Sequence, residues 1–344
     1  MISYKWLKSN HISTMNKRLK IALVVLVLVG VGFFVRATDW RAILEAVRQV
    51  GYYFLFLLFV TFVSAWMAVL AWRFCLPKER VRVSGWKLFW VRLIGENIAI
   101  LNPTSVIGGE AAKIYMLRDL GIPQRQALHS IVLSRAIMII SQIVMLSIAT
   151  IGFLSLTPHS FSWPGLDVRW LLVLVAVAVV VGYLPRSRLF RGKIKKLIHW
   201  LGLLETYQKT RHYVATLWQE LHDFRRGNQQ AMVLSFLFCC LHWIVGSLEF
   251  YFILLFLGIK TTVIKALLVD MGVIVFKTVG GFVPGQIGVE EYGNKVMLSI
   301  IGVAGSTTWI TVSILRRARQ LFWILLGLLM YVVFFRRQNA YFQQ

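Results

Sequence analysis

The sequence has 344 residues, of which 58% are hydrophobic and only 15% charged, a composition that excludes an ordinary soluble domain and indicates an integral membrane protein. Lys and Arg number 38 against 14 Asp and Glu, but basic loops beside spans are typical of the cytoplasmic face, so no nucleic-acid partner is expected. The sequence has no CxxC, HExxH, GxSxG or Walker pattern. We therefore expect no catalytic residues, metal or cofactor.

Six stretches are apolar and long enough, or nearly so, to be predicted as membrane spans. In chain order they are residues 21–36, 51–72, 126–156, 168–184, 230–258 and 306–335. The first follows a basic leader, so a cleaved signal peptide and a retained anchor are both open. We favour the anchor because Arg36 stands where a small-residue cleavage site would lie.

Positive charge is concentrated on one side of these spans, in the leader, residues 73–82, residues 186–226 and Arg336–Arg337. The positive-inside rule places that side in the cytoplasm. We predict a multi-pass protein of the bacterial cytoplasmic (inner) membrane with both termini cytoplasmic. The polar segment 185–230 has apolar residues at helical spacing between lysines. It is predicted to form amphipathic helices that lie on the inner leaflet or pack against the cytoplasmic ends of the spans.

Two stretches, residues 86–119 and 264–301, fit neither a span nor a loop. Each contains two short apolar runs that are split by Pro and Gly and carry several charges. Neither half is long enough to cross a bilayer comfortably. We predict two re-entrant or broken helical hairpins, whose backbone breaks must be buried in protein or line a wet cavity.

These two stretches belong to an internal repeat with an offset of 181 residues, in which both copies read Pro, six residues, Glu, twenty-four residues and Arg. The matched pairs are Pro103 and Pro284, Glu110 and Glu291, and Arg135 and Arg316. Three predicted spans, 126–156, 168–184 and 230–258, separate the interrupted stretch of the first copy from that of the second, and this odd number inverts one stretch relative to the other. We predict a single membrane domain over residues 1–344, with repeat 1 at 86–156 and repeat 2 at 264–335.

Each copy opens a short predicted helix with a Pro- and Gly-rich turn and places its repeated acid in the first helical turn. Backbone N–H groups at such helix ends favour anions, and inverted-repeat transporters bind substrates where paired broken helices meet. The predicted substrate-binding residues are the repeated charges and the turn residues, namely Glu110, Arg135, Glu291, Arg316, Pro103, Gly108, Gly109, Pro284, Gly285 and Gly288.

The stretches "NPTSVIGGEAAKIYMLRDLGI…SRAIMIISQIV" and "VPGQIGVEEYG…ILRRARQLFWILLG" resemble the paired Pro, Gly, Glu and Arg motifs of the lysylphosphatidylglycerol synthase/flippase transmembrane family. The resemblance covers about residues 20–335. It implies movement of a phospholipid between leaflets, with membrane lipids that carry a phosphate or another polar headgroup as partners. Some members add an aminoacyl-transfer domain. This sequence stops at Gln344, so we expect no synthase activity and a separate lipid-modifying enzyme as a possible partner.

The four repeated charged residues have two interpretations. In the structural one, Glu110 and Glu291 cap their helices, and each pairs with an arginine to fasten a hairpin to a span. In the functional one, Arg135 and Arg316 clamp a lipid phosphate, whose oxygens suit the guanidinium fork, while the acids orient them or meet a cationic headgroup. Glu290 has no acidic counterpart in the first copy and is expected to be a local cap or an exposed residue.

The function expected from these features is translocation of a polar or anionic lipid through a cavity lined by the repeated Glu and Arg residues. The alternative is a membrane subunit or transferase in lipid modification or in glycolipid or polysaccharide biosynthesis. An enzyme of that kind would use one of the acids as a base.

Overall fold

The structure is a computed structural model that describes residues 40–76, 83–101, 105–156, 226–280, 288–303 and 305–341, with single positions at 222, 224, 283 and 286. Every regular element in these residues is helical, as predicted. The helices are α2 (Trp40–Val50), α3 (Tyr53–Phe74), α4 (Gly85–Leu101), α5 (Ser105–Asp119), α6 (Gln124–Leu156), α10 (Gln229–Phe256), α11 (Val263–Val279), α12 (Val289–Ile300) and α13 (Ser306–Tyr341).

Three helices of the described part, α3, α6 and α10, are long and apolar enough to cross a membrane. They coincide with the predicted spans at 51–72, 126–156 and 230–258. The sixth predicted span lies within the single long helix α13. The predicted spans at 21–36 and 168–184, and nearly all of the amphipathic segment 185–230, lie outside the described residues.

Helix α2 is an element that the sequence analysis does not predict. Its Ala46 and Val50 are buried in the hydrophobic core, whereas Leu44 and Glu45 are exposed. The helix packs against α13. This one-sided contact explains why one face of α2 is buried and the other exposed, because a helix that packs on one side needs apolar residues on that side only.

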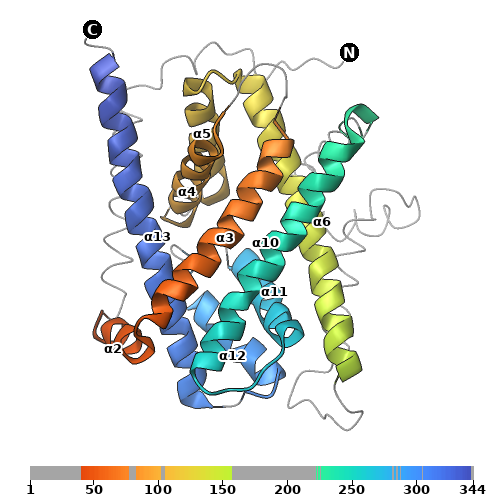
Figure 1. The fold of residues 1–344 in the computed structure, drawn as a ribbon, viewed down its shortest axis with the longest axis vertical. Helices are drawn as coiled ribbons and strands as arrows, with labels where there is room; N and C mark the ends of the chain where they lie inside the picture. The colour runs from red at the N-terminus through yellow and green to blue at the C-terminus, as the bar shows by residue number, and fades with distance from the viewer. Residues whose placement is uncertain are drawn as a thin grey trace, which may run out of the picture.

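Both interrupted segments fold as pairs of short helices, α4 with α5 and α11 with α12, in agreement with the predicted broken hairpins. Figure 1 shows the α4–α5 pair towards the upper end of the bundle and the α11–α12 pair towards the lower end, with α3, α10 and α13 running between them. The inverted relation of the two copies remains a prediction.

Glycines allow the helices of each pair to approach closely. A Cβ on Gly109 of α5 would lie 2.4 Å from the carbonyl oxygen of Gly95 on α4, and a Cβ on Gly95 would lie 2.5 Å from the Lys113 side chain. In the other pair, a Cβ on Gly272 would lie 2.4 Å from the sulfur of Met297. Small residues at membrane helix contacts let backbones pack together, which is how each hairpin stays compact.

Helices α3 and α10 run along each other and are joined by polar groups. His242 Nδ1 lies 2.8 Å from Ser64 Oγ, and Ser64 Oγ also lies 3.0 Å from the carbonyl oxygen of His242. Near the other end of the contact, Ser235 donates to the carbonyl of Ala71 at 2.9 Å. Because lipid offers no hydrogen bonds, such contacts hold spans together, and His242 serves packing here.

Candidate functional site

Charged side chains inside the bundle gather in two groups. The first cluster lies on α4, α5 and α6 and comprises Arg92, Glu96, Glu110, Lys113 and Arg135. The second cluster lies on α10, α11, α12 and α13 and comprises Glu249, Asp270, Lys277, Glu290, Glu291, Arg316, Arg317 and Arg319. Each repeated Glu and Arg of the sequence analysis belongs to one of these clusters.

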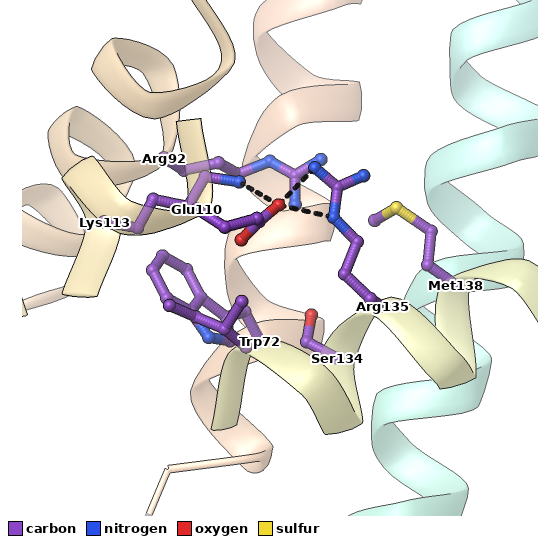
Figure 2. A pocket seen from close by; sticks show the side chains of 8 residues that line it. Trp72, Arg92, Glu110, Lys113, Ser134, Arg135 and Met138 are labelled. Carbon is purple, nitrogen blue, oxygen red and sulfur yellow. Dashed lines mark hydrogen bonds and ion pairs between the residues drawn. The ribbon is translucent and has the colours of Figure 1, made fainter. Parts of the chain in front are cut away.

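In the first cluster, Glu110 of α5 pairs with one cation from its own helix and one from α6, as Figure 2 shows. Arg135 of α6 donates from Nε to Glu110 Oε1 at 2.7 Å, and Lys113 Nζ lies 3.4 Å from the same oxygen. The predicted pairing of Glu110 with an arginine is therefore present. The prediction that Glu110 caps its helix in the first turn is wrong, because α5 begins at Ser105 and Glu110 lies in its second turn.

The first cluster surrounds a small cavity of about 20 Å³. Its lining residues are Trp72, Arg92, Glu110, Lys113, Ile131, Ser134, Arg135 and Met138. The Arg135 side chain is 36% exposed, whereas those of Lys113 and Arg92 are 7% and 11% exposed. Arg92 pairs with Glu96 one turn along α4 at 2.9 Å. The cavity is thus rich in cations and reaches the surface beside Arg135.

The second cluster centres on Arg316 of α13, which three carboxylates surround. Its Nη1 lies 3.3 Å from Asp270 Oδ1 and 3.4 Å from Glu249 Oε2, and its Nε donates to Glu290 Oε1 at 3.1 Å. The guanidinium also lies over the ring of Phe250. The Arg316 side chain is 5% exposed. This arrangement suits a buried cation, which is stable only when it is paired and hydrogen-bonded.

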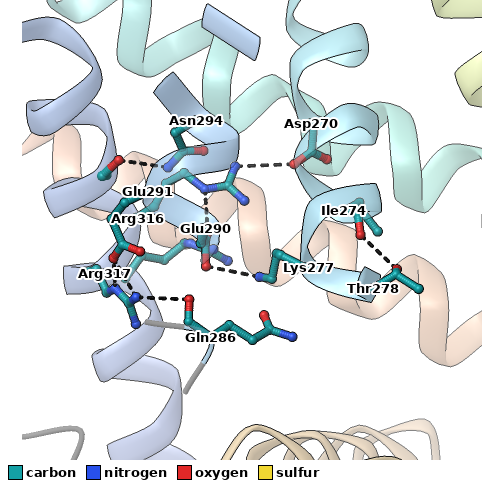
Figure 3. A network of polar contacts seen from close by, with 12 residues as sticks. Asp270, Ile274, Lys277, Thr278, Gln286, Glu290, Glu291, Asn294, Arg316 and Arg317 are labelled. Carbon is teal, nitrogen blue, oxygen red and sulfur yellow. Dashed lines mark hydrogen bonds and ion pairs between the residues drawn. The ribbon is translucent and has the colours of Figure 1, made fainter. Parts of the chain in front are cut away.

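Glu290, and not Glu291, is the inner acid of the second copy. Glu290 is 4% exposed and accepts from Lys277 at 3.1 Å as well as from Arg316 (Figure 3). The expectation that Glu290 is a local cap or an exposed residue is therefore wrong. Adjacent residues of a helix point about 100° apart, so Glu290 and Glu291 lie on different faces of α12 although they are neighbours in the sequence.

Glu291 has the capping role that the structural interpretation predicts. Its Oε2 accepts from the backbone N–H of Gly288 at 2.7 Å, and its Oε1 accepts from Arg317 Nε at 2.6 Å. Gly288 precedes the helix with a φ of +83°, a conformation that favours glycine. The N-terminus of α12 thus already carries a negative group from its own chain. The repeat suggests a contact between Arg316 and Glu291, but Arg316 contacts Glu290 instead.

Glu249 and Arg319 are members of the site that the sequence analysis missed. Arg319 lies 2.6 Å from Glu249, which is 3% exposed and lies in the C-terminal part of the apolar helix α10. The sequence contains one signal for Glu249, which is a single acid within the predicted span 230–258. An ionisable residue at membrane depth is costly without a partner, so a partner was to be expected. The repeat spacing selected Arg316, which is the most enclosed of the three arginines, but it gave no signal for Arg317 and Arg319 beside it in the same helix.

The turn residues are placed only in part. Pro103, Pro284 and Gly285 lie outside the described residues. Gly108 and Gly109 lie inside α5, where Gly109 serves the close contact with α4. Within the described part of the chain, no group of three or more His, Cys, Asp or Glu side chains is arranged to hold a metal ion.

A family model matches most of the chain. No curated protein and no solved structure matches the chain. The family model described as the lysylphosphatidylglycerol synthase TM region matches residues 19–327, which include both helix pairs and all charged residues of both clusters. The chain therefore belongs to the lysylphosphatidylglycerol synthase transmembrane-region family, a family of membrane proteins of lipid metabolism and transport.

Proposed function

We propose that the protein moves a lipid with a polar or anionic headgroup from one leaflet to the other. The observation that carries this proposal is the first cluster, where three cations line a cavity inside the bundle and one of them, Arg135, is 36% exposed. A charged group at membrane depth costs about 2.5–3.5 kcal/mol on insertion scales, and such groups commonly mark a substrate path.

The chemistry of these cations fits a lipid phosphate. A guanidinium offers a planar fork of N–H donors that matches phosphate oxygens, and a lysine adds a compact charge. The apolar side chains of α6 on its exposed face, such as Ile148 and Ile151, suit lipid tails. A headgroup would then cross through protein while its tails remain in the bilayer.

The two helix pairs support a mechanism of alternating exposure. They lie at opposite ends of the bundle (Figure 1), and helix pairs that are related as inverted repeats, as the sequence predicts for these two, can rock against each other around a central site. In this conformation the cluster of the α4–α5 pair reaches the surface at Arg135, while Arg316 in the other cluster is enclosed. Exposure of Arg316 would require separation from its three carboxylates.

The proposal includes the setting of this activity. The protein acts in the bacterial cytoplasmic membrane with both termini in the cytoplasm, does not itself transfer groups between molecules, and takes its lipid from a separate lipid-modifying enzyme or from the membrane pool. The basic loops favour this orientation.

The test is leaflet exchange in vesicles that contain the purified protein and fluorescent phosphatidylglycerol. Arg135→Gln should lower the exchange rate by about tenfold, since it removes a charged hydrogen bond to phosphate. Arg125→Gln is the matched control, because Arg125 is an exposed arginine at the start of the same helix. Equal rates for wild type and Arg135→Gln would contradict the proposal. A chemically altered lipid in vesicles given a soluble donor would favour a transferase.

A further inference from the structure

The first cluster leaves hydrogen-bonding groups unused around its cavity. Three buried atoms of the lining residues have no hydrogen-bond partner among the described residues: Trp72 Nε1, Arg92 Nε and Glu110 Oε2. Trp72 is 3% exposed and Arg92 is 9% exposed. Native proteins pair most of their buried polar groups, so three unpaired atoms around one cavity require an explanation.

The charges around this cavity favour an anion. The lining contains three cations, Arg92, Lys113 and Arg135, and one acid, Glu110. Glu96 neutralises the charge of Arg92 by pairing with its Nη2 atom, and the Nε–H group of Arg92 has no hydrogen-bond acceptor among the described residues. Two of the three unpaired atoms are N–H donors. An acceptor group with several oxygens and a negative charge would satisfy both the charge excess and the donors.

The cavity is too small for such a group while Glu110 stays in place. Its volume of about 20 Å³ has room for about one water molecule. Arg135 and Lys113 both contact Oε1 of Glu110, and a carboxylate presents oxygens to cations as a phosphate does. Glu110 therefore holds the position on these cations that an incoming anion would take.

We propose that the first cluster is a subsite for the phosphate group of a membrane lipid and that Glu110 occupies this subsite in the ligand-free protein. The inference rests on the proposed function and names the ligand chemistry of that site. When the phosphate enters beside Arg135, Arg135 and Lys113 exchange the carboxylate for phosphate oxygens. Arg92 and Trp72 supply the additional N–H donors, and Glu110 turns away.

The ligand chemistry can be tested by binding, without transport. Native mass spectrometry of the purified full chain in detergent compares dioleoylphosphatidylglycerol with dioleoylglycerol, which has the same tails and no phosphate. The phosphate-bearing lipid should bind more tightly. A separate thermal-shift titration with inorganic phosphate tests the free ion. Stabilisation by inorganic phosphate without preferential binding of phosphatidylglycerol would overturn the assignment to a lipid.

Glu110→Gln gives the most specific result, because only one of the two roles of Glu110 predicts tighter binding. As an internal occupant, the carboxylate competes with phosphate, so its neutralisation should tighten phosphatidylglycerol binding by about tenfold. As a purely structural partner, its neutralisation would weaken or not change binding. Arg125→Gln should leave binding unchanged. Unchanged or weaker binding by a folded Glu110→Gln protein would overturn the proposal.

Trp72→Phe keeps the test decisive if Glu110→Gln does not fold. This substitution retains an aromatic ring but removes the unpaired N–H together with part of the indole, so phosphatidylglycerol binding should weaken by about threefold to tenfold. Arg92→Gln should weaken it at least as much. Binding that is insensitive to both substitutions would overturn the subsite.

Failure of the subsite and failure of translocation give different results. Phosphate-dependent binding without leaflet exchange by the wild-type protein would contradict translocation and leave the subsite intact. Leaflet exchange by a protein whose lipid binding does not respond to Trp72, Arg92 or Glu110 would contradict the subsite and leave translocation intact.

Discussion

The first and second clusters use the same residue types on two helix pairs, but they differ in charge balance and exposure. The first cluster has three cations and two acids, and its Arg135 side chain is 36% exposed. The second has four cations and four acids, and its Arg316 side chain is 5% exposed. A balanced and enclosed network fastens helices, whereas a cation-rich and partly open one can accept an anion. The ratio of charges therefore distinguishes the two clusters better than residue type does.

Contacts around the two arginines explain this difference. Arg316 meets acids from α10, α11 and α12, so every helix packed around it supplies compensation. Arg135 pairs with Glu110, an acid that it shares with Lys113. Breaking the contacts of Arg316 leaves several buried charges unpaired, whereas breaking the contacts of Arg135 leaves few unpaired.

The largest expected effect is on stability, from Arg316→Met. The change leaves three buried carboxylates without their shared cation, and we expect the free energy of unfolding to fall by about 5 kcal/mol, the upper end for a broken buried pair. Unfolding in mixed micelles by sodium dodecyl sulfate, followed by tryptophan fluorescence, measures it. A loss no greater than that of Arg135→Met would remove the distinction between the clusters.

Glu290→Gln and Glu291→Gln separate the inner acid from the capping acid. Glu290 is enclosed between Lys277 and Arg316, so its neutralisation should cost about 3 kcal/mol. The Glu291 side chain is 28% exposed, so loss of its charge should cost only about 1 kcal/mol. The same unfolding measurement ranks the two variants, and the reverse order would restore Glu291 as the inner acid.

Gly109→Ala tests whether the first helix pair depends on close backbone contact. The new Cβ would lie 2.4 Å from the carbonyl oxygen of Gly95 and 2.8 Å from Ala99 Cβ, so α4 and α5 must separate. We expect a loss of about 2 kcal/mol, as for overpacked sites. Gly227→Ala is the control, since a Cβ there meets nothing within 4 Å. Equal stability of the two variants would show that the pair tolerates separation.

Arg135→Met should have the smallest effect on stability. Because its ion pair is partly exposed, we expect a loss below about 1 kcal/mol. Circular dichroism and the unfolding midpoint should match wild type, while lipid binding falls. A stability loss similar to that of Arg316→Met would assign Arg135 to fastening the helices.

The sequence predicts the parts of this fold that depend on local pattern. Long apolar stretches give α3, α6 and α10, and the Pro and Gly interruptions give the two helix pairs. Glu110 and Arg135 meet as their repeated spacing predicts. Helix α2 is too short for a spanning pattern, and its one-sided burial depends on α13, which is distant in sequence.

The second cluster could not be assigned from spacing because its members depend on helix rotation. The repeat aligns Glu110 with Glu291, but α12 begins at Val289 and turns Glu290 inward. The repeat selects Arg316 among three arginines within four residues of α13, but only packing shows that Asp270 and Glu249 are its partners and that Arg317 and Arg319 join the cluster. Glu249 gave a signal through its cost in an apolar helix, yet its partners come from α13, which is distant in sequence.

Leaflet exchange by the wild-type protein tests the central claim most directly. Vesicles containing the protein and fluorescent phosphatidylglycerol are treated with dithionite, which quenches only the outer leaflet, and a parallel set carries fluorescent diacylglycerol with the same tails. If the protein moves phosphatidylglycerol between leaflets, dithionite should quench this lipid well beyond the outer-leaflet half, relative to protein-free vesicles, with no comparable change for diacylglycerol. Quenching of phosphatidylglycerol that stops at the outer leaflet in the presence of folded protein would contradict this claim.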